Sequence, residues 1–171
     1  GEPFLHPDLP EIIKHTKNSG IDAAVTTNGV LLKKNIADRV IKYTEWIKVS
    51  INGATRKTYA KIHRCQLDDF DRVIENMSYC VKLRRKNGYK CALGMQLLLL
   101  PENSQEALAL AGLARDIGMD YLVIKPYSQH PKSRTKIYSS IKYDEYQYLS
   151  KDLAKLNTDN FSVIFRMRAM K

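Results

Sequence analysis

Residues with hydroxyl, amide and carboxylate groups gather in short segments, most of which lie in or directly after an apolar run. The segments are Gly1-Glu2-Pro3, Thr26-Thr27-Asn28-Gly29, Ser50-Ile51-Asn52-Gly53, Gly94-Met95-Gln96 and Lys125-Pro126-Tyr127-Ser128-Gln129. Such groups can hydrogen-bond a zwitterion and a ribose, and the neighbouring glycines let the backbone approach a ligand. The pattern predicts a site for a small polar cofactor, although each Asn-Gly pair is also an ordinary turn signal.

Apolar residues predict an alternation of strands and helices that would position these segments. Strands are predicted at 21–27, 46–51, 91–100 and 121–125, and helices between Asp8 and Ser19 and at 32–41, 58–62, 68–87 and 105–117. The run at 21–27 is almost wholly apolar, which predicts a strand buried on both faces. Asp8 and Ser104 are predicted to cap helices.

This alternation predicts parallel strands joined by right-handed crossovers, because a tight hairpin cannot join parallel neighbours. Ligands in such sheets bind at the carboxyl ends of the strands. Beyond residue 129, a polar linker leads to a predicted helix at 143–156 and a half-exposed strand that includes Phe161, Val163, Phe165 and Met167. The sequence lacks an obvious element ahead of Glu2 and stops directly after that strand, so we expect the chain to be part of a longer protein.

The composition is that of one globular domain, with 171 residues of which 44% are apolar. Neither a run of about 18 apolar residues nor a signal peptide is present, which predicts a cytoplasmic protein without a membrane partner. A net charge of +10 permits binding to nucleic acid. Much of this charge falls on predicted helix faces that we expect to be solvated, namely at Lys33, Lys34, Lys82, Arg84, Arg85 and Lys86.

The cysteines and histidines do not show the spacing of a metal site. Cys65, Cys80 and Cys91 are interpreted as free thiols that fill space, and no metal ligand is assigned to this chain. The histidines are scattered and are expected to have structural or solvent roles; they are His6, His15, His63 and His130.

Taken together, the polar segments resemble motifs of the radical S-adenosylmethionine (radical SAM) superfamily over residues 1–130. The run 1–9 looks like the end of that family's Gly-Gly-Glu-Pro motif followed by a helix start. Thr27-Asn28-Gly29 is similar to the ending of its third strand, and Ser50-Ile51-Asn52-Gly53 resembles the Ser-Ile-Asp-Gly ending of its fourth. The spacing between the motifs matches one strand-helix unit each.

This resemblance implies an α/β fold, a partial TIM-like (β/α)6 barrel of parallel strands that lacks its first strands. It implies an enzyme, a radical SAM oxidoreductase or maturase, in which a 4Fe–4S cluster reductively cleaves S-adenosylmethionine to a 5′-deoxyadenosyl radical that abstracts hydrogen from substrate. Residues 1–130 would form the core barrel. Residues 131–171 would be a linker, helix and strand leading towards an absent, SPASM-like C-terminal extension that binds auxiliary clusters.

The resemblance also implies roles for individual residues in binding S-adenosylmethionine. Glu2 would accept a hydrogen bond from the methionine amino group, Asn28 would lie near the ribose, and Ser50 and Arg64 would meet the methionine carboxylate. Gln96 would face the cofactor or the substrate, and the backbone from Lys125 to Tyr127 would flank the adenine. The same site would include Gly1, Pro3, Thr27 and Asn52, the last of which stands where the family often has aspartate.

A Cys-x3-Cys-x2-Cys cluster loop is absent from the sequence. We therefore expect the cluster ligands to lie outside this chain and the chain to be inactive alone. The resemblance implies a small-molecule or peptide substrate and an electron donor in the full-length enzyme, and the sequence does not identify the substrate.

Two alternatives remain open at this stage. One is another parallel α/β enzyme that binds a phosphorylated metabolite, but no Gly-x-Gly-x-x-Gly or Gly-x4-Gly-Lys-Ser/Thr loop is present. The other is a nucleic-acid-binding module, in which aromatic and basic residues hold single strands. Its candidates are Lys136, Tyr138, Lys142, Tyr143, Tyr146 and Tyr148. Helical spacing disfavours this module, because it lets some of the tyrosines face a core.

Overall fold

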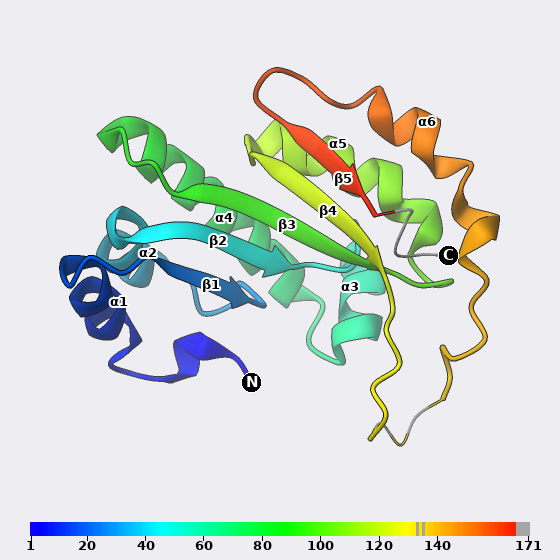
Figure 1. Cartoon of the computed structure of the whole chain (residues 1–171), viewed down its shortest axis with the longest axis horizontal. Coiled ribbons are helices and arrows are strands. Elements are labelled where there is room, and N and C mark those ends of the chain that lie inside the picture. The colour runs from blue at the N-terminus through cyan, green and yellow to red at the C-terminus, as the bar shows by residue number, and fades with distance from the viewer. Residues whose placement is uncertain (133, 135, 167–171) are drawn as a thin grey trace.

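A five-stranded parallel sheet forms the centre of the molecule (Figure 1). The computed structural model describes residues 1–132, 134 and 136–166. In spatial order the strands are β1 (Ala23–Thr27), β2 (Thr44–Ser50), β3 (Ala92–Leu99), β4 (Tyr121–Pro126) and β5 (Ser162–Phe165). Every neighbouring pair is parallel and the strand order follows the sequence. The parallel α/β prediction is confirmed, and the open sheet is consistent with a partial TIM-like barrel.

Helices occupy the connections between the strands. The α-helices are α1 (Leu9–Asn18), α2 (Lys34–Val40), α3 (Arg56–His63), α4 (Asp68–Asn87), α5 (Ala107–Ile117) and α6 (Leu149–Ala154). Short 3-10 helices are η1 (Pro3–Leu5), η2 (Ile41–Tyr43), η3 (Ser104–Glu106) and η4 (Tyr143–Tyr146). Among the described residues, no helix is both long enough and apolar enough to cross a membrane.

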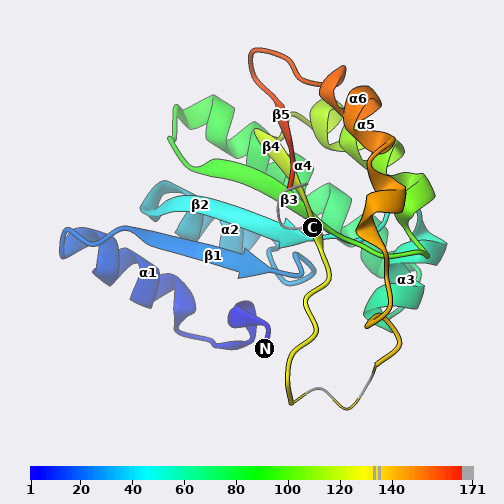
Figure 2. The same cartoon turned by 45° about the vertical axis from the view of Figure 1, so that its right-hand side comes forward.

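The two faces of the sheet differ in burial. Residues such as Ile47, Val49 and Leu93 are fully buried where the sheet packs against the helices, which lie on one side of it (Figure 2). Residues on the other face of β1 are more exposed, Thr26 among them. The prediction that 21–27 is buried on both faces is therefore wrong. The open sheet leaves the second face of this edge strand uncovered, and that face is available to a ligand.

Local differences from the sequence predictions concern helix ends. Ser104 does not cap a helix but lies inside η3, where its hydroxyl donates to the Pro101 carbonyl. Asp8 makes no side-chain cap bond. The predicted helix at 143–156 is divided into η4 and α6. The Tyr143 hydroxyl accepts a hydrogen bond from the Tyr127 amide at 2.7 Å and donates one to the Leu99 carbonyl at 3.0 Å. These bonds hold η4 against the strand ends. Met167 lies outside the described residues.

Arg84 is not on a solvated helix face, contrary to prediction. Its guanidinium pairs with Asp120 and donates to the Cys91 carbonyl at 2.9 Å, and its side chain is only 14% exposed. The Asp120 carboxylate in turn accepts a hydrogen bond from the Leu93 amide at 2.6 Å. This ion pair joins the end of α4 to the starts of β3 and β4.

Glu106 ties α5 to the start of α3. Its carboxylate accepts bonds from the Ala54 amide, from the Thr55 amide and hydroxyl, and from the Thr58 hydroxyl. Burial alone raises the pKa of Glu106, but these hydrogen bonds outweigh it and lower the pKa below its usual value of 4.5. The stabilisation from Glu106 is thus fully present above that value and is lost as the pH falls through the lower folded pKa.

Replacing Glu106 with glutamine is expected to lower the free energy of unfolding by about 2 kcal/mol at pH 7, because bonds to a charged acceptor are lost. The difference from the parent protein should shrink as the pH is lowered below 4.5. Urea unfolding at both pH values measures it, with the exposed Glu145→Gln as a control. A difference that stays constant with pH would contradict the assignment.

Candidate functional site

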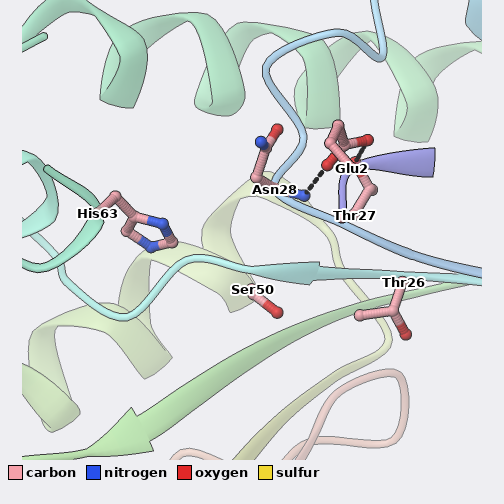
Figure 3. A pocket seen from close by; sticks show the side chains of 7 residues that line it. Glu2, Thr26, Thr27, Asn28, Ser50 and His63 are labelled. Atoms are coloured by element: carbon pink, nitrogen blue, oxygen red, sulfur yellow. Dashed lines mark hydrogen bonds between the residues drawn. The ribbon is translucent and has the colours of Figure 1, made fainter. Parts of the chain in front are cut away.

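A cavity of about 310 Å³ opens where β1 and β2 end (Figure 3). Its lining residues are Gly1, Glu2, Thr26, Thr27, Asn28, Ser50 and His63. Of the residues that the sequence analysis assigned to the cofactor, Gly1, Glu2, Thr27, Asn28 and Ser50 meet here. The predicted convergence of strand-end polar groups is therefore seen for the first two strands.

The Glu2 carboxylate is the centre of a hydrogen-bond network that joins η1 to the end of β1. Its Oε1 accepts the Thr27 hydroxyl at 2.6 Å and the Phe4 amide at 3.1 Å. Its Oε2 accepts the Asn28 amide at 2.8 Å. A carboxylate offers about four lone-pair sites, so this network leaves room for one more donor. Because Glu2 lines the cavity, a ligand cation can supply that donor.

Three further polar groups of the cavity have no partner within the described part of the chain. They are the Thr26 hydroxyl, the Ser50 hydroxyl and the amide nitrogen Nδ2 of Asn28. Asn28 uses only its Oδ1, which accepts the Val30 amide at 3.0 Å and shapes the turn after β1. The cavity thus offers hydroxyls and an amide donor beside a carboxylate, a set that suits a ligand with both amino and hydroxyl or carboxylate groups.

His63 closes one end of the cavity and was assigned no ligand role from the sequence. Its ring stacks on Tyr59 with 4.3 Å between centroids. Its Nε2 lies 3.1 Å from the Ile51 carbonyl oxygen, which can only accept, so we assign the ring hydrogen to Nε2. Burial lowers the pKa of His63, although the bond to Ile51 opposes this, and the ring is neutral at pH 7. Its unprotonated Nδ1 can then accept a hydrogen bond.

A second cavity of about 260 Å³ lies on the open face of β2, β3, β4 and the end of β5. It is lined by Lys48, Gln96, Tyr121, Val123, Lys125, Ile164 and Arg166. Gln96 and Lys125 therefore line a different cavity from the first group of predicted residues. Lys48, Tyr121 and Arg166 were missed. A lysine inside the apolar run 46–51 was the available signal for Lys48.

The remaining predicted site residues line neither cavity. Pro3 begins η1 directly after Glu2. Asn52 adopts a left-handed backbone with φ 53°, and its Oδ1 accepts the Leu98 amide at 2.7 Å. Arg64 is exposed at the left-handed end of α3. Tyr127 packs edge-on against Tyr138 with 5.3 Å between ring centroids. Their predicted cofactor contacts stay predictions.

The fold and the cavity define a parallel α/β protein with a polar ligand site at the carboxyl ends of its strands. The family model of the Radical SAM superfamily matches residues 1–114, and the chain belongs to this superfamily of enzymes. The chain is 34% identical over 124 residues to a probable GTP 3′,8-cyclase of Metallosphaera sedula, covering 71% of this chain and 37% of that protein. It is 29% identical over 144 residues to the GTP 3′,8-cyclase of Chlorobaculum tepidum, covering 79% and 40%. The chain thus spans well under half the length of these relatives.

Solved structures share the fold at low sequence identity. Streptococcus suis SuiB bound to S-adenosylmethionine superimposes with a TM-score of 0.69 and 18% identity, covering 97% of this chain and 38% of SuiB. A domain of the pyruvate-formate lyase-activating enzyme from Bacteroides vulgatus gives a TM-score of 0.65 and 17% identity, covering 96% and 94%. Both likenesses support the architecture of the sheet and its helices.

The superfamily uses S-adenosylmethionine and a 4Fe–4S cluster, and the described residues fit only the first. They contain no group of three or more histidine, cysteine or acidic side chains that could hold a metal ion. Cys80 and Cys91 are buried, and burial raises the pKa of each thiol to about 12. The first cavity, in contrast, has the open lone pair and the free hydroxyl and amide groups that an amino acid joined to a nucleoside needs.

Proposed function

We propose that this chain binds S-adenosylmethionine as part of a radical SAM enzyme that starts hydrogen abstraction from its substrate. The observation that carries the proposal is the convergence of Glu2, Asn28 and Ser50 on one cavity at the strand ends. The remaining lone pair of the Glu2 carboxylate accepts a hydrogen bond from the methionine amino group, which is positively charged. When bound next to a reduced cluster, S-adenosylmethionine supplies a carbon radical.

The other groups of the cavity orient the cofactor. The Ser50 hydroxyl and the neighbouring Thr26 hydroxyl bond the methionine carboxylate or the ribose, and Nδ2 of Asn28 donates to a ribose oxygen. His63 bounds the site with a neutral ring, so it adds no positive charge near the sulfonium. In this proposal, residues 1–130 form the core barrel, and residues 131–171 lead towards a C-terminal extension.

For the full-length enzyme, the proposal also includes ligands for the cluster, a substrate and an electron donor. Because the sequence has no Cys-x3-Cys-x2-Cys loop, we propose that the cluster is held by residues outside this chain and that the chain alone is inactive. The substrate is a small molecule or a peptide. The names of similar proteins support either kind. One relative is a GTP 3′,8-cyclase and another a probable GTP 3′,8-cyclase, and SuiB has been solved bound to the precursor peptide SuiA.

The full-length protein, reconstituted with iron and sulfide without oxygen and reduced with dithionite, is expected to release 5′-deoxyadenosine from S-adenosylmethionine. Liquid chromatography measures the product, and protein kept free of iron is the control. Calorimetry should show binding of S-adenosylmethionine to the reconstituted protein. If neither binding nor product is seen, the proposed function is wrong.

Replacing Ser50 with alanine is expected to weaken the binding of S-adenosylmethionine by about threefold to tenfold, since one uncharged hydrogen bond is lost. Calorimetric titration measures the change. Ser150→Ala on α6 serves as the matched control, because Ser150 lies on a helix that does not line the cavity. Equal dissociation constants for Ser50→Ala and Ser150→Ala would remove Ser50 from the site.

A further inference from the structure

The second cavity is strongly basic. Three cationic side chains line it: Lys48 of β2, Lys125 of β4, and Arg166, which directly follows β5. None of the three forms an ion pair with a carboxylate among the described residues. No acidic side chain is found among the described residues that line the cavity. Like charges gathered on one face of a sheet repel one another, so an anion bound among them would reduce this repulsion.

Two of the three charges, Lys48 and Lys125, are held in partly buried positions, whereas Arg166 is exposed at the edge of the cavity. Lys48 and Lys125 are half-buried in strands, and Gln96 between them is only 8% exposed. Lys48 also lies over the Trp46 ring, with Nζ 5.3 Å from the centroid. Burial, together with Lys125 and Arg166, lowers the pKa of Lys48. A bound anion would relieve both the desolvation and the repulsion.

Tyr121 shapes the floor of this cavity because it packs across Gly94. The two residues are direct partners between β3 and β4, and a Cβ added at Gly94 would overlap the Tyr121 ring. The absence of a side chain at Gly94 thus lets the ring lie flat across the sheet. An aromatic floor, the Gln96 amide and the apolar Val123 can contact the uncharged part of a ligand.

The basic cavity adjoins the cavity proposed for S-adenosylmethionine. Thr26 of the first cavity pairs with Lys48 of the second, and Ser50 of the first pairs with Gln96 of the second. Neighbouring strands lie about 4.7–4.9 Å apart. A molecule held by the cations therefore lies next to the cofactor, where a substrate has to lie.

We propose that Lys48, Lys125 and Arg166 bind an anionic group of the substrate, a carboxylate or a phosphate, on the open face of the sheet. The inference rests on the proposed function, because it takes the ligand next to S-adenosylmethionine to be the substrate. The cations anchor the anionic end, Gln96 and Tyr121 contact the adjoining part of the molecule, and the rest of the substrate reaches towards Ser50 and the cofactor.

Calorimetric titrations of the full-length protein with inorganic phosphate and with malonate, at low ionic strength, test this proposal. The double variant Lys48→Gln/Lys125→Gln is expected to bind the preferred probe about tenfold more weakly or worse, because charge-assisted bonds are lost. The control is Lys86→Gln/Lys90→Gln, which makes the same charge change at exposed positions near the start of β3. Tighter binding of phosphate identifies a phosphorylated substrate, and tighter binding of malonate a carboxylic acid.

A second variant guards against loss of structure. Gly94→Ala keeps all three cations but is expected to turn the Tyr121 ring into the cavity, and so to weaken binding of the same probe. Removing the repelling lysines should leave the melting temperature of Lys48→Gln/Lys125→Gln unchanged or higher. Failure of both probes to bind the parent protein, or equal binding by parent and double variant, would overturn the inference.

Titration with S-adenosylmethionine separates this inference from the proposed function. The double variant should bind the cofactor within about twofold of the parent, because the two lysines lie outside the first cavity. Retained cofactor binding without anion binding overturns only the inference. Loss of cofactor binding in the parent protein overturns the proposed function itself.

Discussion

Replacing Asn103 with alanine is expected to lower the free energy of unfolding by about 3 kcal/mol or more. Asn103 is fully buried, and its side chain makes three hydrogen bonds to two neighbouring segments. Its Oδ1 accepts the Leu100 amide at 2.8 Å, while its Nδ2 donates to the carbonyls of Leu98 at 2.8 Å and Asn52 at 3.0 Å. Each buried group left without a partner costs about 1–3 kcal/mol, and removal of the Asn103 side chain leaves three backbone groups without one.

Thermal unfolding measures this effect in a chain of 171 residues. At about 2–4 °C for each kcal/mol, the melting temperature should fall by at least about 6 °C. Asn160→Ala is the matched control, because Asn160 is exposed and its side chain makes no hydrogen bond to another described residue. If Asn103→Ala melts within about a degree of Asn160→Ala, water or a shifted backbone has replaced the lost bonds and the account of this network is wrong.

The network around Asn103 also shows which contacts local sequence patterns do not predict. The run Pro101-Glu102-Asn103 correctly predicts the end of a strand, because its residues interrupt an apolar segment. The resemblance to the radical SAM family implies that Asn52 belongs to the cofactor site, and this assignment stays a prediction. In the structure its left-handed backbone directs the side chain to the Leu98 amide on the next strand. A side chain that bonds across strands depends on the register of the sheet, which local sequence does not contain.

The strands themselves were predictable because their apolar runs are long and their breaks are clear. The convergence of Glu2, Asn28 and Ser50 on the first cavity was also predicted. The second cavity was not, since it depends on which alternate residues of each strand face away from the helices. Thr26 and Ser50 fall on the open face with Lys48, whereas Val25 and Val49 fall on the helix side. Once the burial of one face is known, period-two alternation assigns the other face without further information.

At the end of α3, backbone conformation decides that His63 lines the cavity and that Arg64 does not. Arg64 was predicted to meet the methionine carboxylate, and the structure places the adjacent His63 in the cavity. Arg64 takes the left-handed conformation that ends the helix, with φ 54°, and its side chain is exposed. The sequence here lacks the glycine that usually marks such an end, so the turn was not foreseen.

Replacing Glu2 with glutamine is expected to weaken the binding of S-adenosylmethionine to the full-length protein by about tenfold to a hundredfold. The amide keeps the shape of the carboxylate but loses its charge, and its nitrogen cannot accept the bond that Oε1 or Oε2 now accepts. A bond to a charged group contributes about 1.5–3 kcal/mol, and each 1.4 kcal/mol is a tenfold change in the dissociation constant. Calorimetric titration gives the dissociation constant directly.

The matched control for Glu2→Gln is Glu11→Gln on α1, where the exposed carboxylate pairs with Arg39 and Lys14. It makes the same change of charge away from the cavity, so its dissociation constant should equal that of the parent. Circular dichroism of both variants tests whether η1 and β1 stay folded once Thr27 and Asn28 lose a charged acceptor. A folded Glu2→Gln protein that binds S-adenosylmethionine as tightly as Glu11→Gln would show that Glu2 only joins η1 to β1. The amino group of the cofactor would then have to be bound elsewhere.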